Sequence, residues 1–351
     1  MWRFILRPLL FLFDAERVHY ASMGIFAFFL QWRWSRRWVR AFCLMDDPRL
    51  KTQLLDMDLP SPVGLAAGFD KDARWYNALS ALGFGFVEVG TLTAHAQDGN
   101  PKPRLFRLPE DRAVLNRFGF NNGGAASAAQ RIQATPPECV LGINIGKSKI
   151  AENEYAVEDY LASLREVQSL AHYLVVNVSS PNTAGLRDLQ AEEPLRKLLG
   201  ALVEENARLA NEAGTRRPPL FVKVAPDMED AQIVASVALV RELGVDGIVC
   251  TNTTISRADL TTDASRVEAL GAGGISGAPL TERSLAFVRR VCELADGAFP
   301  VIGVGGIMEP KDALAMLDAG ATAIQLYTGF IYGGPLVVRR MNQAILAARQ
   351  A

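Results

Sequence analysis

The sequence predicts an α/β protein: a closed (β/α)8 barrel of the TIM type behind a short amphipathic N-terminal helical extension. Eight short apolar or β-branched runs follow position 48, and helical stretches with glycine punctuation separate them, as in repeated βα units. Apolar residues make up 49% and charged residues 21% of the chain, which is typical of a compact globular protein. Because barrels of roughly 250 residues fold as one unit, we predict an extension of residues 1–45 and a barrel domain of residues 46–351.

The extension combines aromatic residues and positive charge in a helical pattern. Residues 1–49 hold eight arginines against four carboxylates, in a chain whose net charge is −1. Trp34 and Trp38 are four positions apart and share a helical face. The neighbouring arginines fall largely on another face, namely Arg33, Arg36, Arg37 and Arg40. We therefore expect two short helices over about 5–42 to lie in the plane of a bilayer. A helical pair packed on the barrel, or a dimer contact, is the alternative.

Several classes of protein are excluded. The apolar start of the chain lacks a small-residue cleavage site, and the run 25–30 is too short to cross a membrane, which takes about 20 apolar residues. The main body of the chain after residue 49 has no Lys/Arg-dense stripe and no nucleic-acid motif, so a nucleic-acid partner is not expected. The four cysteines and three histidines are scattered without metal-ligand or disulfide spacing. We predict neither a metal site nor a disulfide framework, and structural roles for the histidines.

The predicted strands end in residues that suit an active site. In such barrels, the site is assembled from the loops at the C-terminal ends of the strands. The eight runs are 63–67, 86–90, 140–144, 173–178, 220–224, 247–251, 300–304 and 323–327, and each ends in, contains or precedes a polar residue or glycine. Lys223 lies inside one apolar run, and buried lysine is rare unless it is paired. A bound anion or an electron-rich cofactor would provide that partner.

Glycines at the ends of the last two strands predict a phosphate site. Residues 304–307 and 328–329 supply the close backbone approach and the N–H groups with which barrels commonly bind phosphate. No Rossmann GxGxxG unit and no P-loop accompany them. We therefore expect the phosphate to belong to a cofactor such as FMN. The tetrapeptide 179–182, Ser-Ser-Pro-Asn, would by itself be read as a turn.

Seven motifs, in this order, together resemble the dihydroorotate dehydrogenases over about 45–335. The motifs are LAAGFDK at 65–71, NRFGFNN at 116–122, LGINIGK at 141–147, NVSSPN at 177–182, TNTT at 251–254, GGISG at 273–277 and GVGGI at 303–307. In that family the soluble members use a cysteine base after the fourth strand, whereas the membrane-associated, quinone-dependent members use serine and carry an N-terminal helical extension. Ser180 and the extension resemble the quinone-dependent class in its bacterial form, a peripheral protein on the cytoplasmic side of the cell inner membrane.

The resemblance implies oxidation of (S)-dihydroorotate to orotate in de novo pyrimidine (UMP) biosynthesis, with FMN as cofactor and a membrane quinone as electron acceptor. Ser180 would remove the C5 proton while hydride passes from C6 to the flavin. The implied FMN contacts are Ala66, Ala67, Gly68, Phe69, Asp70, Thr91, Asn144, Asn177, Lys223, Thr251, Gly277, Gly306, Tyr327 and Thr328. The implied substrate contacts are Lys71, Asn116, Arg117, Phe118, Gly119, Phe120, Asn177, Asn182, Asn252 and Thr253. Lys223 would stabilise negative charge on the reduced flavin, and Lys71 would hold the substrate carboxylate.

Further expectations concern a loop, the extension and the oligomeric state. Residues 182–190, with Gly185 as a pivot, resemble a loop that covers the substrate. Thr328 stands where many relatives have serine, which keeps the hydroxyl group. Removal of residues 1–42 should spare flavin reduction by the substrate but impair quinone reduction and lipid binding, because we expect the extension to be an anchor. We expect a monomer.

Two other functions stay open from the residues alone. One is a soluble dihydropyrimidine or dihydroorotate oxidoreductase that uses a different electron acceptor, which a cysteine at position 180 and no extension would have favoured. The other is a non-catalytic, membrane-docked flavin- or phosphate-binding barrel with vestigial motifs. Such a binder needs only the phosphate loops, so the joint presence of base, lysines and asparagines disfavours it.

Overall fold

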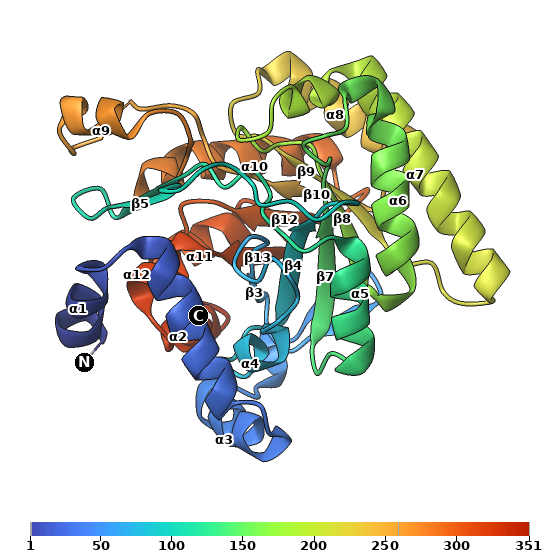
Figure 1. The fold of residues 1–351 in the computed structure, drawn as a ribbon. Coiled ribbons are helices and arrows are strands. Elements are labelled where there is room, and N and C mark those ends of the chain that lie inside the picture. The colour runs from blue at the N-terminus through green and yellow to red at the C-terminus, as the bar shows by residue number, and fades with distance from the viewer. Residues whose placement is uncertain (1, 259, 351) are drawn as a thin grey trace.

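The structure, a computed structural model, describes residues 2–258 and 260–350. Eight parallel strands close into a barrel in the order β10-β12-β13-β3-β4-β7-β8-β9 (Figure 1). These strands are β3 (Val63–Leu65), β4 (Phe86–Leu92), β7 (Val140–Ile145), β8 (Tyr173–Asn177), β9 (Leu220–Val224), β10 (Gly247–Cys250), β12 (Val301–Val304) and β13 (Ala323–Leu326). Each predicted run coincides with one of them to within two residues at either end, and the prediction of a (β/α)8 barrel is confirmed.

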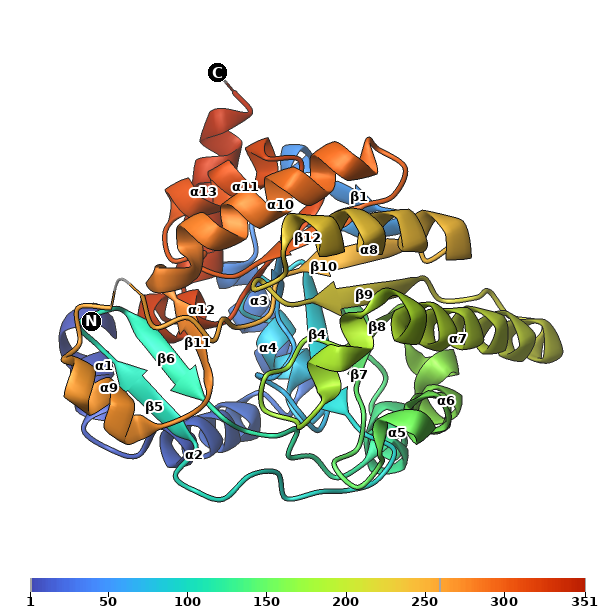
Figure 2. The ribbon, with the colours of Figure 1, turned by 90° about the horizontal axis from the view of Figure 1, so that it is seen from above.

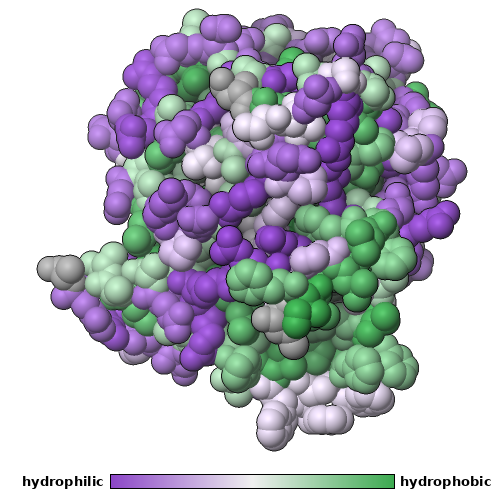
Figure 3. Space-filling model, turned by 90° about the vertical axis from the view of Figure 1, so that its left-hand side faces the viewer, coloured by the Kyte–Doolittle hydropathy of each residue, from purple (hydrophilic) through white to green (hydrophobic). Residues whose placement is uncertain are grey.

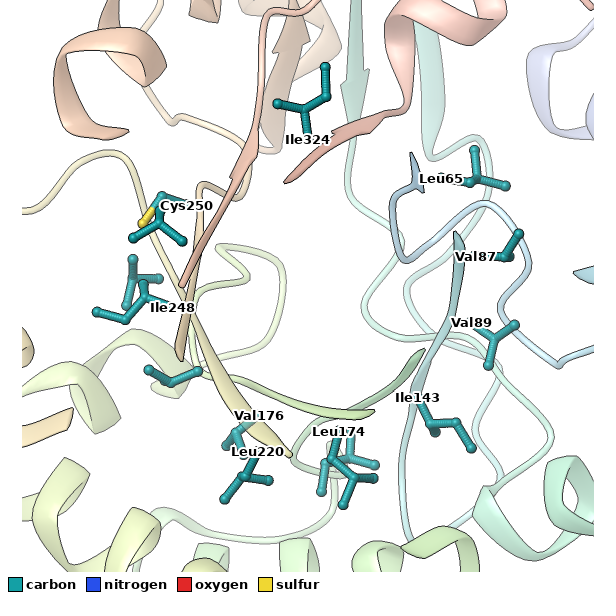
Figure 4. Close-up of a cluster of buried hydrophobic side chains, with 14 of the residues drawn as sticks. Leu65, Val87, Val89, Ile143, Leu174, Val176, Leu220, Ile248, Cys250 and Ile324 are labelled. Atoms are coloured by element: carbon teal, nitrogen blue, oxygen red, sulfur yellow. The ribbon is translucent and has the colours of Figure 1, made fainter. Parts of the chain in front are cut away.

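Helices follow the barrel strands and cover their outer faces. They are α4 (Tyr76–Ser80), α5 (Ala125–Ala134), α6 (Ala156–Val167), α7 (Glu192–Ala213), α8 (Asp230–Leu243), α10 (Thr281–Ala295), α11 (Pro310–Asp318), α12 (Thr328–Gly333) and α13 (Val337–Ala348). Single 3-10 turns occur at Pro48–Leu50, Asn153–Tyr155, Gln168–Leu170, Leu186–Gln190 and Ala278–Leu280. Strand side chains such as Val89, Leu220 and Ile248 point away from the barrel axis into the layer beneath these helices (Figure 4). Strands buried on both faces read as continuous apolar runs, which is why the sequence identified them.

Aromatic rings fill the N-terminal end of the barrel interior. Phe86, Tyr173 and Phe221 pack there on one another, and the hairpin of β1 (Thr52–Leu54) and β2 (Met57–Leu59) packs against them. The neighbouring strands carry glycines where the rings lie. A Cβ atom added at Gly142 would stand 2.1 Å from Cζ of Tyr173, and one at Gly64 would stand 2.4 Å from Phe86. The missing side chains therefore make room for the aromatic layer.

A small antiparallel sheet stands beside the barrel and was not predicted from the sequence. It has the order β11-β6-β5, with β5 (Leu105–Leu108), β6 (Ala113–Asn116) and β11 (Gly274–Gly277). Both views place it, with α9 (Ala264–Leu270), on the side of the N-terminal helices (Figure 2). Because β11 pairs with β6 from Gly274 opposite Asn116 to Gly277 opposite Ala113, two of the seven motifs are held together here.

The N-terminal extension is helical, as predicted, but its described residues form three α-helices where the sequence predicted two, because the chain turns at 12–14 as well as at 30–32. A π-helical turn, Trp2–Leu6, precedes α1 (Arg7–Phe11), α2 (Ala15–Phe29) and α3 (Arg33–Cys43). No helix among the described residues is long and apolar enough to cross a membrane. The predicted boundary between residues 45 and 46 falls shortly after α3, and it stays a prediction.

The two faces of the extension differ. One face packs on the barrel: Met23 and Leu30 are buried, and Arg36 donates two hydrogen bonds, of 2.8 and 3.0 Å, to the carboxylate of Glu138. The opposite face exposes large apolar side chains, namely Phe4, Ile5, Leu9, Leu12, Phe13, Ile25, Phe28, Phe29, Trp32, Trp34, Trp38 and Phe42. Figure 3 shows apolar side chains gathered in the lower right part of this side of the molecule. Arg36 thus binds the barrel, while the tryptophans stay uncovered.

The aromatic layer gives a stability prediction. Gly142→Ala forces a methyl group into the ring of Tyr173, so we expect it to lower the free energy of unfolding by about 1–3 kcal/mol. Gly200→Ala is the matched control, because a Cβ atom there meets nothing within 4 Å in the middle of α7. That change should stabilise the protein by roughly 0.5–1 kcal/mol. Urea unfolding measures both, and equal stabilities for the two variants would contradict the packing described here.

Candidate active site

A cavity of about 960 Å³, including its opening to solvent, lies at the C-terminal ends of the barrel strands. Most of the predicted site residues line it: Ala66, Ala67, Gly68, Lys71, Thr91, Asn116, Phe118, Gly119, Phe120, Asn177, Ser180, Asn182, Lys223, Thr251, Asn252, Thr253, Gly277, Gly306, Tyr327 and Thr328. Val304, Gly305, Ile307 and Gly329, which belong to the predicted phosphate site, also line it. The lining residues that sequence reasoning missed are Ser276, Leu280, Met308 and Gln325. Several of these lie beside a predicted residue in the same motif, so extending each motif by one or two positions would have found them.

Four predicted residues lie outside the lining of this cavity. Asp70 is fully buried and accepts hydrogen bonds from the backbone N–H groups of Arg74 and Trp75. Burial raises the pKa of its carboxyl group to about 6. The side chain of Phe69 contacts the rings of Tyr327 and Phe330. Asn144 makes hydrogen bonds with Glu88 and Thr91. Arg117 donates to the backbone oxygens of Leu270 and Ala272. These contacts indicate that they support their neighbours.

A chain of buried hydrogen bonds crosses the floor of the cavity. Asn177 donates to Oγ1 of Thr91 at 2.9 Å, and that hydroxyl donates to Oδ1 of Asn144 at 2.6 Å. Asn144 in turn donates to Glu88 at 2.8 Å, and Glu88 also accepts from Gln325 at 2.6 Å. Four strands are tied together in this way. Because each link satisfies a buried polar group, the floor is held in one arrangement.

Lys223 reaches the cavity from the middle of β9. It is buried, and its Nζ makes no hydrogen bond to any described residue, although buried polar groups are normally paired. Burial lowers the pKa of the ammonium group, and the carboxylate of Glu88 opposes that shift. Sequence reasoning expected only an anion or cofactor as the partner and missed Glu88. The signal was available, since Glu88 interrupts its apolar run as Lys223 interrupts its own.

Backbone donors are available on one side of the cavity. The N–H groups of Gly305, Gly306, Ile307, Thr328 and Gly329 donate to no acceptor within residues 2–258 and 260–350, and all five residues line the cavity. Gly306 has φ +70°, and a Cβ atom there would lie 2.2 Å from Cα of Thr281. Free backbone N–H groups are phosphate ligands. Together with the unpaired ammonium of Lys223, they fit a phosphorylated, electron-rich cofactor, as the sequence predicted.

The opposite side of the cavity carries the predicted base and amides. Oγ of Ser180 accepts the backbone N–H of Asn182 at 3.2 Å, and the side chain of Asn182 donates to Asn116 at 3.2 Å. The amide of Asn252 donates to Oγ of Ser179 at 2.9 Å. These residues come from β6, from the loop after β8 and from the loop after β10. The barrel thus brings donors and acceptors from distant motifs to one place beside Ser180.

Lys71 is a second buried lysine at this side. Its Nζ donates to the backbone oxygen of Gly68 at 2.8 Å and lies 3.6 Å from the centroid of the Phe118 ring. Burial lowers the pKa of this ammonium group to about 8, and the negative charge of Glu16 is the largest opposing influence. An anionic ligand would stabilise the charged form of Lys71, so this end of the cavity suits a carboxylate.

The predicted cover loop, 182–190, is fixed to the segments that follow β8 and β10, and its first residue, Asn182, lines the cavity. Gly185 has φ +65°, a left-handed conformation that glycine adopts at little cost, and the turn Leu186–Gln190 follows it. Arg187 donates to the backbone oxygens of Ser179 and Thr253, both at 3.0 Å, and pairs with Asp227 at 2.9 Å. One guanidinium group therefore fixes the loop to the segments that follow three neighbouring strands, β8, β9 and β10.

A second cavity, of about 1100 Å³, lies between the extension and the barrel. Its walls are mostly apolar and include His19 and Phe26 of α2 together with Phe330. Burial and the nearby ammonium of Lys71 lower the pKa of His19 to about 3, so its imidazole is neutral at physiological pH. Phe118 and Tyr327 line both cavities. The two spaces are thus separated by a single layer of side chains.

Comparisons with known proteins show to which family the chain belongs. A family model described as dihydroorotate dehydrogenase matches residues 49–348. The dihydroorotate dehydrogenase (quinone) of Thermobifida fusca is 48% identical over 351 residues, 99% of this chain and 92% of the relative. That of Chloroflexus aurantiacus is 48% identical over 349 residues, 98% and 96% of the two chains. A crystal structure of Eimeria tenella DHODH in complex with ferulenol has a TM-score of 0.85 at 36% identity, covering 96% of this chain and 92% of the other. With this identity and coverage, the chain belongs to the dihydroorotate dehydrogenase family.

Proposed function

We propose that FMN and dihydroorotate bind together in the barrel cavity, with Ser180 as the base, and that a quinone accepts the electrons from the cavity beneath the extension. Family membership makes the protein an oxidoreductase of pyrimidine biosynthesis that oxidises dihydroorotate with quinone as acceptor, and it implies a flavin. The observation that carries the finer proposal is that Ser180, two buried lysines and four asparagine amides line one cavity together with free backbone N–H groups. A non-catalytic barrel that only binds a flavin or a phosphate would need only the free backbone N–H groups.

The phosphate side of the cavity supports FMN as the flavin. Its free N–H groups gather at two neighbouring strand ends, 305–307 and 328–329, which suits one phosphate group. When bound, FMN supplies an acceptor for the hydride from C6 of dihydroorotate and a two-electron donor for the quinone. Lys223 would balance the negative charge that reduction adds, because its ammonium has no hydrogen-bond partner among the described residues. No step requires a metal ion, and the described residues include no cluster of three or more His, Cys, Asp or Glu side chains that could hold one.

Ser180 would remove the C5 proton while the hydride leaves C6. Serine is a weak base, so most of the rate must come from positioning and from groups that stabilise charge on Oγ. The backbone N–H of Asn182 already donates to that oxygen. Asn116, Asn177, Asn182 and Asn252 would hold the ring of the substrate, and Lys71 would hold its carboxylate. The cover loop, fixed by Arg187, would keep bulk water away from these groups.

The second cavity would admit the quinone. It is mostly apolar, it lies under the uncovered face of α2, and it shares Phe118 and Tyr327 with the barrel cavity. A lipid-soluble acceptor could therefore reach the flavin without displacing the pyrimidine. The neutral imidazole of His19 would serve as a hydrogen-bonding group for the quinone oxygen.

The uncovered face of the extension would dock on lipid. Trp34 and Trp38 are 65% and 80% exposed, and they stand among the phenylalanines of α2 and α3. Tryptophan, phenylalanine and arginine together suit the headgroup boundary of an anionic bilayer. We place the protein as a monomer on the cytoplasmic side of the inner membrane, where this face is covered by lipid and the second cavity opens towards the quinone pool.

Ser180→Ala tests the base. The purified variant should keep its yellow flavin and its stability, whereas dihydroorotate oxidation near neutral pH should fall by about 100-fold or more, because general-base catalysis is lost. Anaerobic flavin bleaching by dihydroorotate measures this step alone. Ser61→Ala is the matched control, a fully buried serine before β3 at the other end of the barrel, and it should bleach normally. A Ser180→Ala protein that bleaches at the normal rate would refute the assignment.

Lys71 predicts the pH dependence of orotate binding. With the pKa of its ammonium near 8, the lysine is charged below pH 8 and loses its proton as the pH rises through that value. The Kd of orotate should therefore be constant below pH 8 and rise by about tenfold per pH unit above it. Titration of the flavin absorbance with orotate measures this. Lys71→Met should bind weakly at every pH, and a rise that persists in this variant would assign the titration to another group.

The lipid proposal concerns two exposed tryptophans. The double variant Trp34→Gln/Trp38→Gln should bind vesicles of phosphatidylglycerol and phosphatidylethanolamine about tenfold more weakly or worse, because both rings lose their place at the headgroup boundary. Ile150→Gln changes an equally exposed apolar side chain, 73% exposed, outside the extension and should have no effect. Vesicle sedimentation gives the affinities. Unchanged binding, or a concentration-dependent dimer that buries the tryptophans, would contradict the proposal.

A further inference from the structure

Helix α2 of the extension places an acidic side chain beside the substrate end of the barrel cavity. Glu16 is only 4% exposed, and its carboxylate accepts three hydrogen bonds from the guanidinium group of Arg104, at 2.8, 3.1 and 3.3 Å. Both side chains are buried, and a buried charge without a partner is strongly unfavourable. The pair is therefore a fixed connection between the extension and the segment that leads into β5. Tyr20 of α2 adds a second contact, accepting a hydrogen bond from Asn121 at 3.2 Å.

Arg104 continues this connection towards the cavity. Its Nη1 donates to the backbone oxygens of Asp98 and Asn100. The side chain of Asn100 then donates to the backbone oxygens of Arg117 and Asn182, at 3.0 and 3.1 Å. Arg117 precedes Phe118, which lines the cavity, and Asn182 is the residue whose backbone N–H meets Ser180. A series of polar contacts thus runs from α2 to Asn182, which lines the cavity, and to Arg117, whose neighbour Phe118 lines it.

Electrostatics point the same way. The ring of Phe118 lies between two cations, with Nζ of Lys71 at 3.6 Å and the guanidinium carbon of Arg104 at 5.7 Å from its centroid. The carboxylate of Glu16 supplies a negative charge that offsets the repulsion between these two cations. Without it, Arg104 would repel the ammonium of Lys71, the group that faces the substrate carboxylate in the proposed function.

We propose that Glu16 is a positioning residue for dihydroorotate: through Arg104 it fixes Phe118 and the loop after Ser180, and its carboxylate balances the positive charges of Arg104 and Lys71 at the Phe118 ring. This inference rests on the proposed function of the barrel cavity. It also changes what removal of residues 1–42 should do. If the extension were only an anchor, flavin reduction by the substrate would be spared, but this geometry makes the extension part of the substrate site, so truncation should impair both half-reactions.

The experiment compares two ion pairs that both join the extension to the barrel. Glu16→Gln breaks the pair with Arg104, whereas Glu138→Gln breaks the pair between the barrel and Arg36, a buried arginine of α3. For Glu16→Gln we expect the KM for dihydroorotate to rise roughly tenfold to a hundredfold, with flavin content and the rate of quinone reduction by the pre-reduced enzyme kept within about twofold. For Glu138→Gln the KM should be unchanged. An equal rise in KM for both variants would show general loosening of the extension and would overturn the proposal.

A pH profile separates positioning from simple loss of structure. The charged or titratable groups that face Lys71 are Glu16, Arg104, Asp70, Asp72 and His19. Of these, Glu16 is the strongest favourable influence on the ammonium, so its loss should move the pH at which orotate binding weakens to below the value for the unaltered protein. Glu138→Gln should leave that pH in place. An unshifted profile in Glu16→Gln would contradict the electrostatic part of the proposal.

A double variant guards against misfolding. If Glu16→Gln unfolds because Arg104 is left unpaired, Glu16→Gln/Arg104→Gln removes both charges and should restore thermal stability while the KM defect stays. A double variant with normal KM would overturn the proposal. Flavin bleaching of the unaltered protein by dihydroorotate tests the proposed function separately, so failure there would be distinguished from failure of the Glu16 inference.

Discussion

The filling of the barrel at its N-terminal end is the constraint on which the rest of the molecule depends. Phe86, Tyr173 and Phe221 occupy that space, and glycines on neighbouring strands make room for their rings. The hydroxyl of Tyr173 donates a hydrogen bond to Glu88 at 3.2 Å, so the aromatic layer directly contacts the polar layer above it. From Glu88 the hydrogen bonds pass through Asn144 and Thr91 to Asn177 at the cavity. The aromatic layer therefore determines where the hydrogen-bonding side chains of the cavity floor lie. The buried ammonium group of Lys223 is tolerated there because the buried carboxylate of Glu88 lies near it.

The extension has a double role in this account. Its uncovered face suits lipid, and its inner face closes an apolar cavity that shares Phe118 and Tyr327 with the barrel cavity. A flavin on one side of these residues and a quinone on the other would explain how two half-reactions with chemically different substrates use one cofactor. The ion pair of Glu16 and Arg104 adds a mechanical and electrostatic connection to the same arrangement. The segment that we propose to dock on the membrane would thus also be a wall of the proposed quinone cavity and a support of the substrate site.

The sequence predicted the barrel and the place of the cavity because both depend on local patterns. Strands buried on two faces appear as apolar runs, and residues at their C-terminal ends converge whatever the loops do, which is why Lys223 stood out. The roles of Ser180 and Asn252 came only from the resemblance to a known family, because their local sequence by itself indicates a turn and a helix cap. The antiparallel sheet was missed because its strands are short and because β11 pairs with β6 across 158 positions of the chain, as Gly274 does with Asn116. Glu88 and Glu16 were missed for a related reason: their roles depend on partners from other elements. The contacts of Asn144, Arg117, Phe69 and Asp70 likewise could not be predicted from the sequence, because they depend on how the folded elements pack.

The central claim is that substrate and quinone approach one flavin from separate cavities. The most direct test is anaerobic stopped-flow spectroscopy in two steps, in which dihydroorotate first bleaches the flavin and a soluble quinone analogue then restores its colour. The decisive variable is orotate, added in saturating amounts before the quinone. If the cavities are separate, the rate of colour recovery stays the same with and without orotate. If orotate slows recovery in competition with the quinone, both ligands use the barrel cavity, and the assignment of the second cavity is wrong.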